Sequence, residues 1–107
     1  MRASDAIAML DRQIERHGQP IALRRGSGAA FSTRAFVRAY KPSELVGLIT
    51  QADRNVVLSP SGLGTFGIPK ATDDVSIAGA VGKVIGAPEP VHIGSTLVRV
   101  NMTVRMT

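Results

Sequence analysis

One stretch of the sequence spells a motif with a known chemical use. Residues 62–67 read GLGTFG, which fits the G-x-G-x-x-G pattern of loops that bind a dinucleotide. In those loops the third glycine opens a helix, and an acidic residue about 20 positions later binds the ribose. Here Ile68 and Pro69 follow the motif, and Ala87 and Pro88 stand where the acid is needed. We therefore interpret this stretch as a flexible loop.

Acidic side chains are candidates for acid–base chemistry or metal binding. Asp73 and Asp74 are adjacent, so on a strand their side chains point to opposite faces and cannot share a proton or a metal ion. Adjacent acids at the start of a strand usually bond to their own backbone. Asp53, His17 and His92 stand apart from them, and the chain has no cysteine. The sequence predicts no catalytic residue, metal site or cofactor, and favours a protein that is not an enzyme.

Basic residues give a clearer signal. The formal net charge is +5 at pH 7. Between positions 16 and 43 the chain has no acid and six basic residues, namely Arg16, Arg24, Arg25, Arg34, Arg38 and Lys41. A solvated sheet face is one explanation of this pattern. The other is a surface that meets an acidic partner, either protein or DNA.

The first element that positions these side chains is a short amphipathic helix, predicted over about residues 5–17. Ile7, Leu10 and Ile14 recur at helical spacing, and Gly18 followed closely by a proline supplies the stop. A helix this short is marginal alone, so we expect it to dock on the sheet or on a neighbouring subunit.

Two strands follow, which we predict to pair as a hairpin over residues 20–25 and 31–40. Side chains along the second strand alternate between its faces, so Arg34, Phe36 and Arg38 share one of them. A solvated face or a partner surface would both use this arrangement.

The middle of the chain is less regular. Residues 45–51 are apolar enough for a buried strand or a single helical turn, and residues 56–58 form a short apolar run. Residues 61–72 hold three glycines and Pro69. We expect a long mobile loop there, because glycines make ordering entropically costly.

The last third of the chain predicts a long two-stranded ribbon. Residues 81–85 form one strand, and Pro88 and Pro90 mark the connection because proline cannot donate to a ladder. Residues 97–106 form the other strand. Apolar and polar residues alternate there, so we expect the even-numbered side chains to face the core; these are Val98, Val100, Met102, Val104 and Met106.

Together these elements predict a single domain that is mainly β. We expect a small antiparallel β-barrel or sandwich over about residues 20–106, with a short N-terminal helix and a long glycine-rich loop. The chain of 107 residues has no apolar run near the ~18 residues of a membrane helix. We therefore expect no contact with a membrane.

Three segments fit a recurring family pattern. Residues 51–59 fit q-x-d-x-x-v-x-x-s, and residues 69–84 fit p-x-x-x-D-x-v-x-i-x-g-x-x-x-x-V. Residues 97–105 are similar to a strand of the form v-x-y-x-l-x-v-r-G, without its glycine and with Asn101 where an aromatic residue is usual. In this order the segments resemble the head–tail joining proteins of long-tailed bacteriophages and prophages, also called head-completion or stopper proteins.

The resemblance implies a structural protein of the virion, made in the bacterial host cytoplasm and located at the head–tail interface. Such a protein closes the filled head and docks the tail. Its implied partners are the portal or adaptor, tail proteins and, on assembly, copies of itself in a ring, whereas the isolated chain can be monomeric.

Two alternatives stay open, a tail terminator and a small OB-like barrel that binds nucleic acid. Nucleic acid is the less favoured partner, because only Phe36 and Tyr40 share a face with Arg34 and Arg38 for stacking bases. The predicted partner-interface residues are Arg24, Arg25, Arg34, Phe36, Arg38, Lys41, Leu63 and Phe66.

Overall fold

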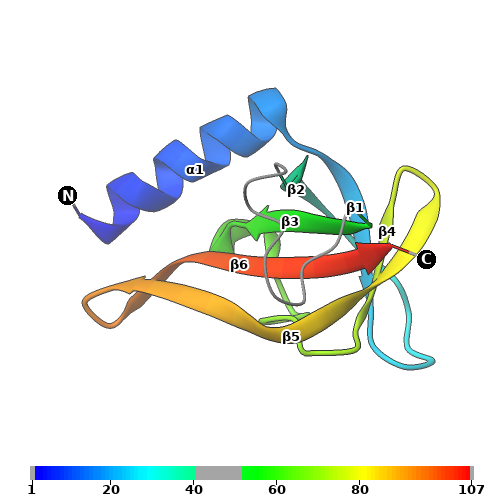
Figure 1. Ribbon diagram of the computed structural model, residues 1–107. Coiled ribbons are helices and arrows are strands. Elements are labelled where there is room, and N and C mark those ends of the chain that lie inside the picture. Colours follow the sequence, from blue (N-terminus) through cyan, green and yellow to red (C-terminus); the bar gives the residue numbers. More distant parts are fainter. Residues whose placement is uncertain (1, 41–51, 107) are drawn as a thin grey trace.

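The computed structural model describes residues 2–40 and 52–106. Its one α-helix is α1 (Ala3–His17), and a 3-10 turn, η2 (Pro60–Gly62), follows the third strand. The strands of the described residues are β1 (Gln19–Arg24), β2 (Phe31–Ala39), β3 (Asp53–Leu58), β4 (Asp74–Ile77), β5 (Ala80–Ile93) and β6 (Thr96–Met106). They pair antiparallel and close into a barrel in the order β1-β2-β3-β6-β5-β4 (Figure 1). The predicted β-barrel with an N-terminal helix is confirmed.

The barrel core is aliphatic and is filled by alternate residues of every strand. Along β6 the predicted alternation is confirmed, because Val98, Val100, Met102 and Val104 are buried whereas Arg99 is exposed. Strand β3 is buried on both sides. Its Val56 and Leu58 point into the barrel, whereas Val57 belongs to a separate cluster beneath α1.

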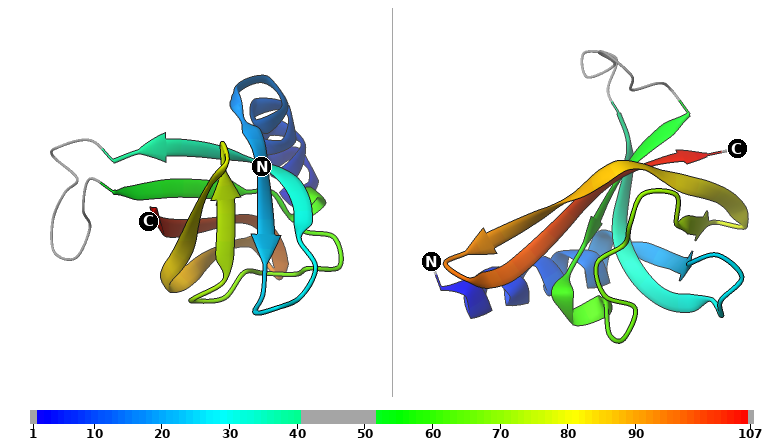
Figure 2. Two further views of the ribbon diagram at one scale, coloured as in Figure 1. Left: turned by 90° about the vertical axis from the view of Figure 1, so that its right-hand side faces the viewer. Right: turned by 90° about the horizontal axis from the view of Figure 1, so that it is seen from below.

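Strand β5 corrects one prediction. Pro88 and Pro90 do not mark a connection, because β5 runs without a break through both of them. Its register against β6 shifts between Ile85 and Glu89, and such a bulge accommodates residues that cannot donate to a ladder. The chain reverses later, where Gly94 adopts a φ of 61°. The two-stranded ribbon is therefore longer than the sequence pattern predicted, and Figure 2 shows it projecting beyond the barrel.

The glycine-rich segment between β3 and β4 contributes to the core. It begins with η2, and Leu63 directly after that turn is only 4% exposed and packs among the core side chains. Pro69 is also fully buried. The mobility of this loop stays a prediction. The predicted strand or turn at residues 45–51 lies outside the described residues.

Helix α1 begins slightly before its predicted start and lies across the outside of the barrel (Figures 1 and 2). Within the described residues, no helix combines the length and the apolar character needed to cross a membrane.

Candidate functional site

The predicted interface residues fall into two separate regions. Arg34, Phe36 and Arg38 lie on the outer face of β2, on the side that α1 covers. Four others gather at the end of the β1–β2 hairpin and the loop packed against it, namely Arg24, Arg25, Leu63 and Phe66. Lys41 lies outside the described residues. The predicted interface residues therefore lie in two regions of the fold, and their role in an interface stays a prediction.

Apolar packing fixes α1 on the barrel. Leu10 and Ile14 are one helical turn apart, and both pack against Val57 of β3 and Phe36 of β2. These two strand residues are opposite each other in the β2–β3 register. Leu10, Ile14 and Val57 are each less than a tenth exposed. The predicted docking of the helix on the sheet is thus observed at this contact.

Polar contacts hold α1 along its length. The Asp11 carboxylate accepts hydrogen bonds from the hydroxyls of Ser59 and Ser61, the latter at 2.7 Å. At the other end, Arg34 donates from Nη2 to the Gly18 carbonyl at 2.9 Å. A cation is favourable there because the helix dipole is negative at its C-terminus. Arg34 therefore helps to hold the end of α1 on the barrel, and its place in a partner interface stays a prediction.

Gly18 lets the helix end approach β2 closely. A Cβ atom at this position would lie 2.5 Å from the Ile14 carbonyl oxygen and 2.7 Å from that of Ala35. Its own N–H bonds the Ile14 carbonyl and closes the last turn. Since backbone atoms occupy both near positions, any side chain here requires the helix to move away from the barrel.

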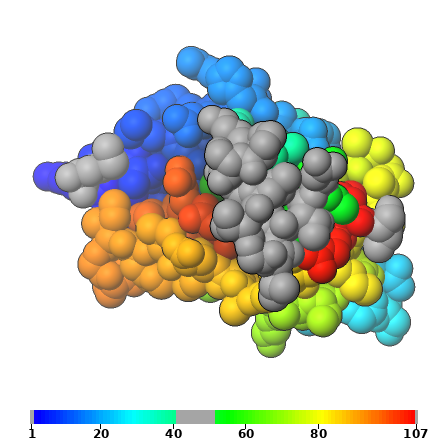
Figure 3. All heavy atoms as spheres, in the orientation of Figure 1, coloured from blue at the N-terminus to red at the C-terminus, as the bar shows by residue number. Residues whose placement is uncertain are grey.

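A groove of about 990 Å³ runs between α1 and the outer face of the barrel. Helix residues from 9 to 17 form one wall, outward side chains of β2, β3 and β6 form the floor, and β5 forms the other wall. Figure 3 shows α1 and the β5–β6 ribbon side by side at one end of this face. We call this space the helix groove; among the described residues, the basic and acidic side chains that line it are Arg12, Arg16, His17, Arg38, Glu89 and Arg99.

The helix groove carries an excess of positive charge. Arg12, Arg16 and Arg99 are exposed, and no hydrogen bond or ion pair engages them among residues 2–40 and 52–106. Arg38 lies over the Tyr40 ring, 5.7 Å from its centroid, and the Tyr40 hydroxyl is 2.7 Å from that of Thr103. The groove can therefore attract anionic groups while its aromatic residues are already engaged.

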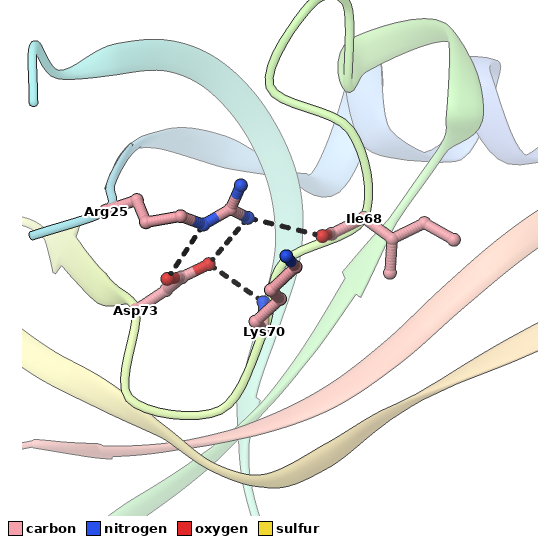
Figure 4. Close-up of polar contacts among 4 residues, drawn as sticks. All are labelled: Arg25, Ile68, Lys70 and Asp73. Atoms are coloured by element: carbon pink, nitrogen blue, oxygen red, sulfur yellow. Dashed lines mark hydrogen bonds and ion pairs between the residues drawn. The ribbon is translucent and has the colours of Figure 1, made fainter.

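The second region centres on a two-point contact between Arg25 and Asp73 (Figure 4). Arg25 donates from Nε and Nη2 to the two carboxylate oxygens at 3.2 and 3.0 Å, and its guanidinium lies 4.6 Å from the Phe66 ring centroid. The same carboxylate accepts the Lys70 N–H at 2.8 Å. A third contact joins Arg25 to the Ile68 carbonyl at 3.4 Å. We call this set the loop lock, because it ties the glycine-rich loop to the end of β1.

Electrostatics keep the Asp73 carboxylate ionised. Burial alone would raise its pKa. The hydrogen bonds from Arg25 and from the Lys70 amide, together with the positive charges of these two side chains, outweigh burial and lower the pKa. The pKa of Arg25 is raised, chiefly by its hydrogen bond to Asp73. The predicted bond of this acid to its own backbone is confirmed. Asp73 therefore has a structural explanation.

The other two aspartates considered as candidates, Asp74 and Asp53, also have internal partners. Asp74 pairs with Lys83 at 2.6 Å, away from the side chain of Asp73, and the fully buried Asp53 pairs with Arg105 at 2.8 Å. Across the described part of the chain, no group of three or more potential metal ligands forms. At the G-x-G-x-x-G stretch, residues 62–67 form η2 and turns, and no helix opens at Gly67.

Sequence patterns missed two members of the helix groove, Arg12 and Arg99. Both carried a signal, since Arg12 is polar on an amphipathic helix and Arg99 is an odd-numbered residue of β6. Their convergence depends on where α1 docks, which spacing along the chain does not encode.

Comparisons of the chain with protein-family models, curated proteins and solved structures found no match.

Proposed function

We propose that this protein is a head–tail joining protein, a non-enzymatic component of a phage or prophage virion that closes the filled head and docks the tail. The observation that supports the proposal is where the residues of the family pattern lie. Its three segments contribute β3, β4, the start of β5 and β6, and these four strands are consecutive neighbours around the barrel.

The pattern residues make the contacts that hold these strands together. Asp53 of the first segment bonds Arg105 of the last, with Nε at 2.8 Å and Nη2 at 3.1 Å from its oxygens. Val75, Ile77 and Val84 of the middle segment lie in the core. The recurring positions are thus those on which this barrel depends, as expected if the likeness to the family extends to the fold.

The charged surface fits the same role. A protein that acts by docking needs a surface that attracts its partner, and the helix groove has an excess of arginine over acid. Complementary charge speeds association and orients the partners, although it supplies only part of the affinity. Copies of the chain, the portal or adaptor and the tail are the partners we propose.

A nucleic-acid-binding barrel receives less support. Such barrels stack bases on exposed aromatic faces above a basic groove. Here Phe36 packs beneath α1, and one face of Tyr40 lies under Arg38. The aromatic residues that accompany the arginines are therefore not a free stacking surface.

The experiment is deletion of the gene from the phage or prophage that encodes the chain, followed by electron microscopy of the particles. We expect filled heads and complete tails that remain separate, and joining restored when the purified protein is added. Particles that assemble normally without the protein would overturn the proposal. Tails of irregular length, with heads unaffected, would identify a tail terminator instead.

A further inference from the structure

We infer that the helix groove binds an extended acidic segment of a partner protein. The inference deepens the proposed function and depends on it only for the identity of the partner as a virion protein. The binding chemistry itself follows from the charge, spacing and rigidity of the groove.

Three arginines of the groove carry charge that the described part of the fold does not compensate. Arg12 and Arg16 are one turn apart on α1, and Arg99 projects outward from β6. Within the described ranges none of the three has a hydrogen bond or an ion pair, and Glu89 is the acid that lines the groove with them. Arginine binds carboxylates in a two-point geometry, and the loop lock shows this chain using it at Asp73.

The positive charges on the floor of the groove are spaced apart. Arg38 lies in one row with Asn55 and Thr103 across β2, β3 and β6, and Arg99 is four residues from Thr103 along β6. At about 4.8 Å between strands and about 3.4 Å per residue, the Cα atoms of Arg38 and Arg99 are on the order of 16 Å apart. An extended peptide of about five residues spans this distance and can place a separate carboxylate at each of the two arginines.

The backbone of such a segment must be held by side chains of the groove floor. Strand β3 at the centre of the floor already pairs with β2 on one side and with β6 on the other, so a segment that lies on it cannot pair with it as an added strand. Side-chain amides line the groove instead, from Gln13 on α1, Asn55 on β3 and Asn101 on β6. Each amide can both donate to and accept from a peptide group. Met9, which is 43% exposed at the groove, offers an apolar contact for a residue between two acids.

The helix wall of the groove is held in place by hydrogen bonds. The contacts of Asp11 with Ser59 and Ser61, and that of Arg34 with Gly18, fix the helix wall relative to the floor. A groove whose walls are already fixed loses little conformational entropy when it binds. The segment, rather than the barrel, therefore carries most of the ordering cost.

The experiment measures fluorescence anisotropy of a labelled peptide of about ten residues, in which leucine and glutamate alternate, against the full-length protein at low salt. The double variant Arg12→Ala, Arg99→Ala should bind the peptide at least about tenfold more weakly, because it loses two charge-assisted contacts. The matched control is Arg2→Ala with Lys70→Ala, which removes the same charge from two exposed positions outside the groove. We expect that control to change binding less than about twofold, because distant surface charges are screened. Circular dichroism and thermal melting check that both variants fold.

Three results would overturn the inference. Equal losses in the two variants would mean that net charge alone attracts the peptide. Inorganic phosphate that displaces the peptide at low concentration would indicate a compact anion site. A labelled oligothymidine that binds more tightly than the peptide, and loses binding in the groove variant, would indicate nucleic acid. Failed peptide binding with intact head–tail joining removes the groove assignment alone, whereas a virion that assembles without the protein removes the joining function alone.

Discussion

The loop lock and the helix groove use arginine in opposite ways. In the loop lock, Arg25 contacts a buried carboxylate with two nitrogens and covers the Phe66 ring, so its charge is neutralised within the fold. In the helix groove, Arg12 and Arg99 project from α1 and β6 without such a partner among the described residues. The comparison teaches that a run of basic residues does not locate an interface. What matters is which of them the fold leaves uncompensated.

The largest effect should come from removing the acid of the loop lock. Asp73→Ala leaves Arg25 without its carboxylate and the Lys70 amide without its acceptor. We expect a loss of about 2 kcal/mol in the free energy of unfolding, as for a broken buried charge-assisted bond. Urea unfolding measures it. The adjacent Asp74→Ala removes an exposed ion pair and should cost less than about 1 kcal/mol; equal costs would contradict the structural role of Asp73.

A smaller effect should follow from releasing the helix end. Arg34→Ala removes the donor to the Gly18 carbonyl, and we expect it to lower the free energy of unfolding by about 1 kcal/mol. Binding of the acidic peptide should weaken as well, because the groove wall is less fixed. Arg24→Ala, which removes an exposed arginine from β1, is the control for both measurements. Unchanged stability in the Arg34 variant would remove this residue from the contacts that hold α1.

Acid should weaken the loop lock. The pKa of Asp73 is lowered in the folded state, so its contribution to stability is complete above its unfolded pKa of about 3.9 and is lost as pH falls through the lower folded value. The free energy of unfolding should therefore fall less steeply below about pH 4 in Asp73→Ala than in the wild type. Parallel curves would show that Asp73 has the same pKa folded and unfolded.

The smallest effect on stability should come from the groove itself. Arg12→Ala with Arg99→Ala removes exposed side chains with no partner among the described residues, so the free energy of unfolding should change by less than about 0.5 kcal/mol. Thermal melting measures it. A marked destabilisation would mean that these arginines support the fold, as Arg25 does.

Much of the fold could be predicted from local patterns. Alternation along β6 fixed which residues face the core, and the spacing of Leu10 and Ile14 fixed the face of α1 that docks. The connection at Pro88 and Pro90 was mispredicted because proline forbids donation to a ladder but is compatible with a bulge. That exception depends on the partner strand, which local sequence does not reveal.

The candidate site was less predictable than the fold. Arg34, Phe36 and Arg38 were correctly placed on one face of β2, since that follows from the period of a strand. The partners of Arg25 and Arg34 were not predictable, because Asp73 and Gly18 meet them through tertiary contacts. The same contacts decide which arginines stay uncompensated, so the helix groove became visible only in three dimensions.

The most direct test compares head–tail joining by two purified variants, added to filled heads and tails from the deletion strain. The account predicts that the double variant Arg12→Ala, Arg99→Ala folds normally but joins particles much more slowly than the wild type, and that added salt slows the wild type more than the variant. Arg2→Ala with Lys70→Ala should join them at nearly the wild-type rate. Equal rates for the two variants would contradict the claim that the helix groove, with its uncompensated arginines, is the surface that meets the partner.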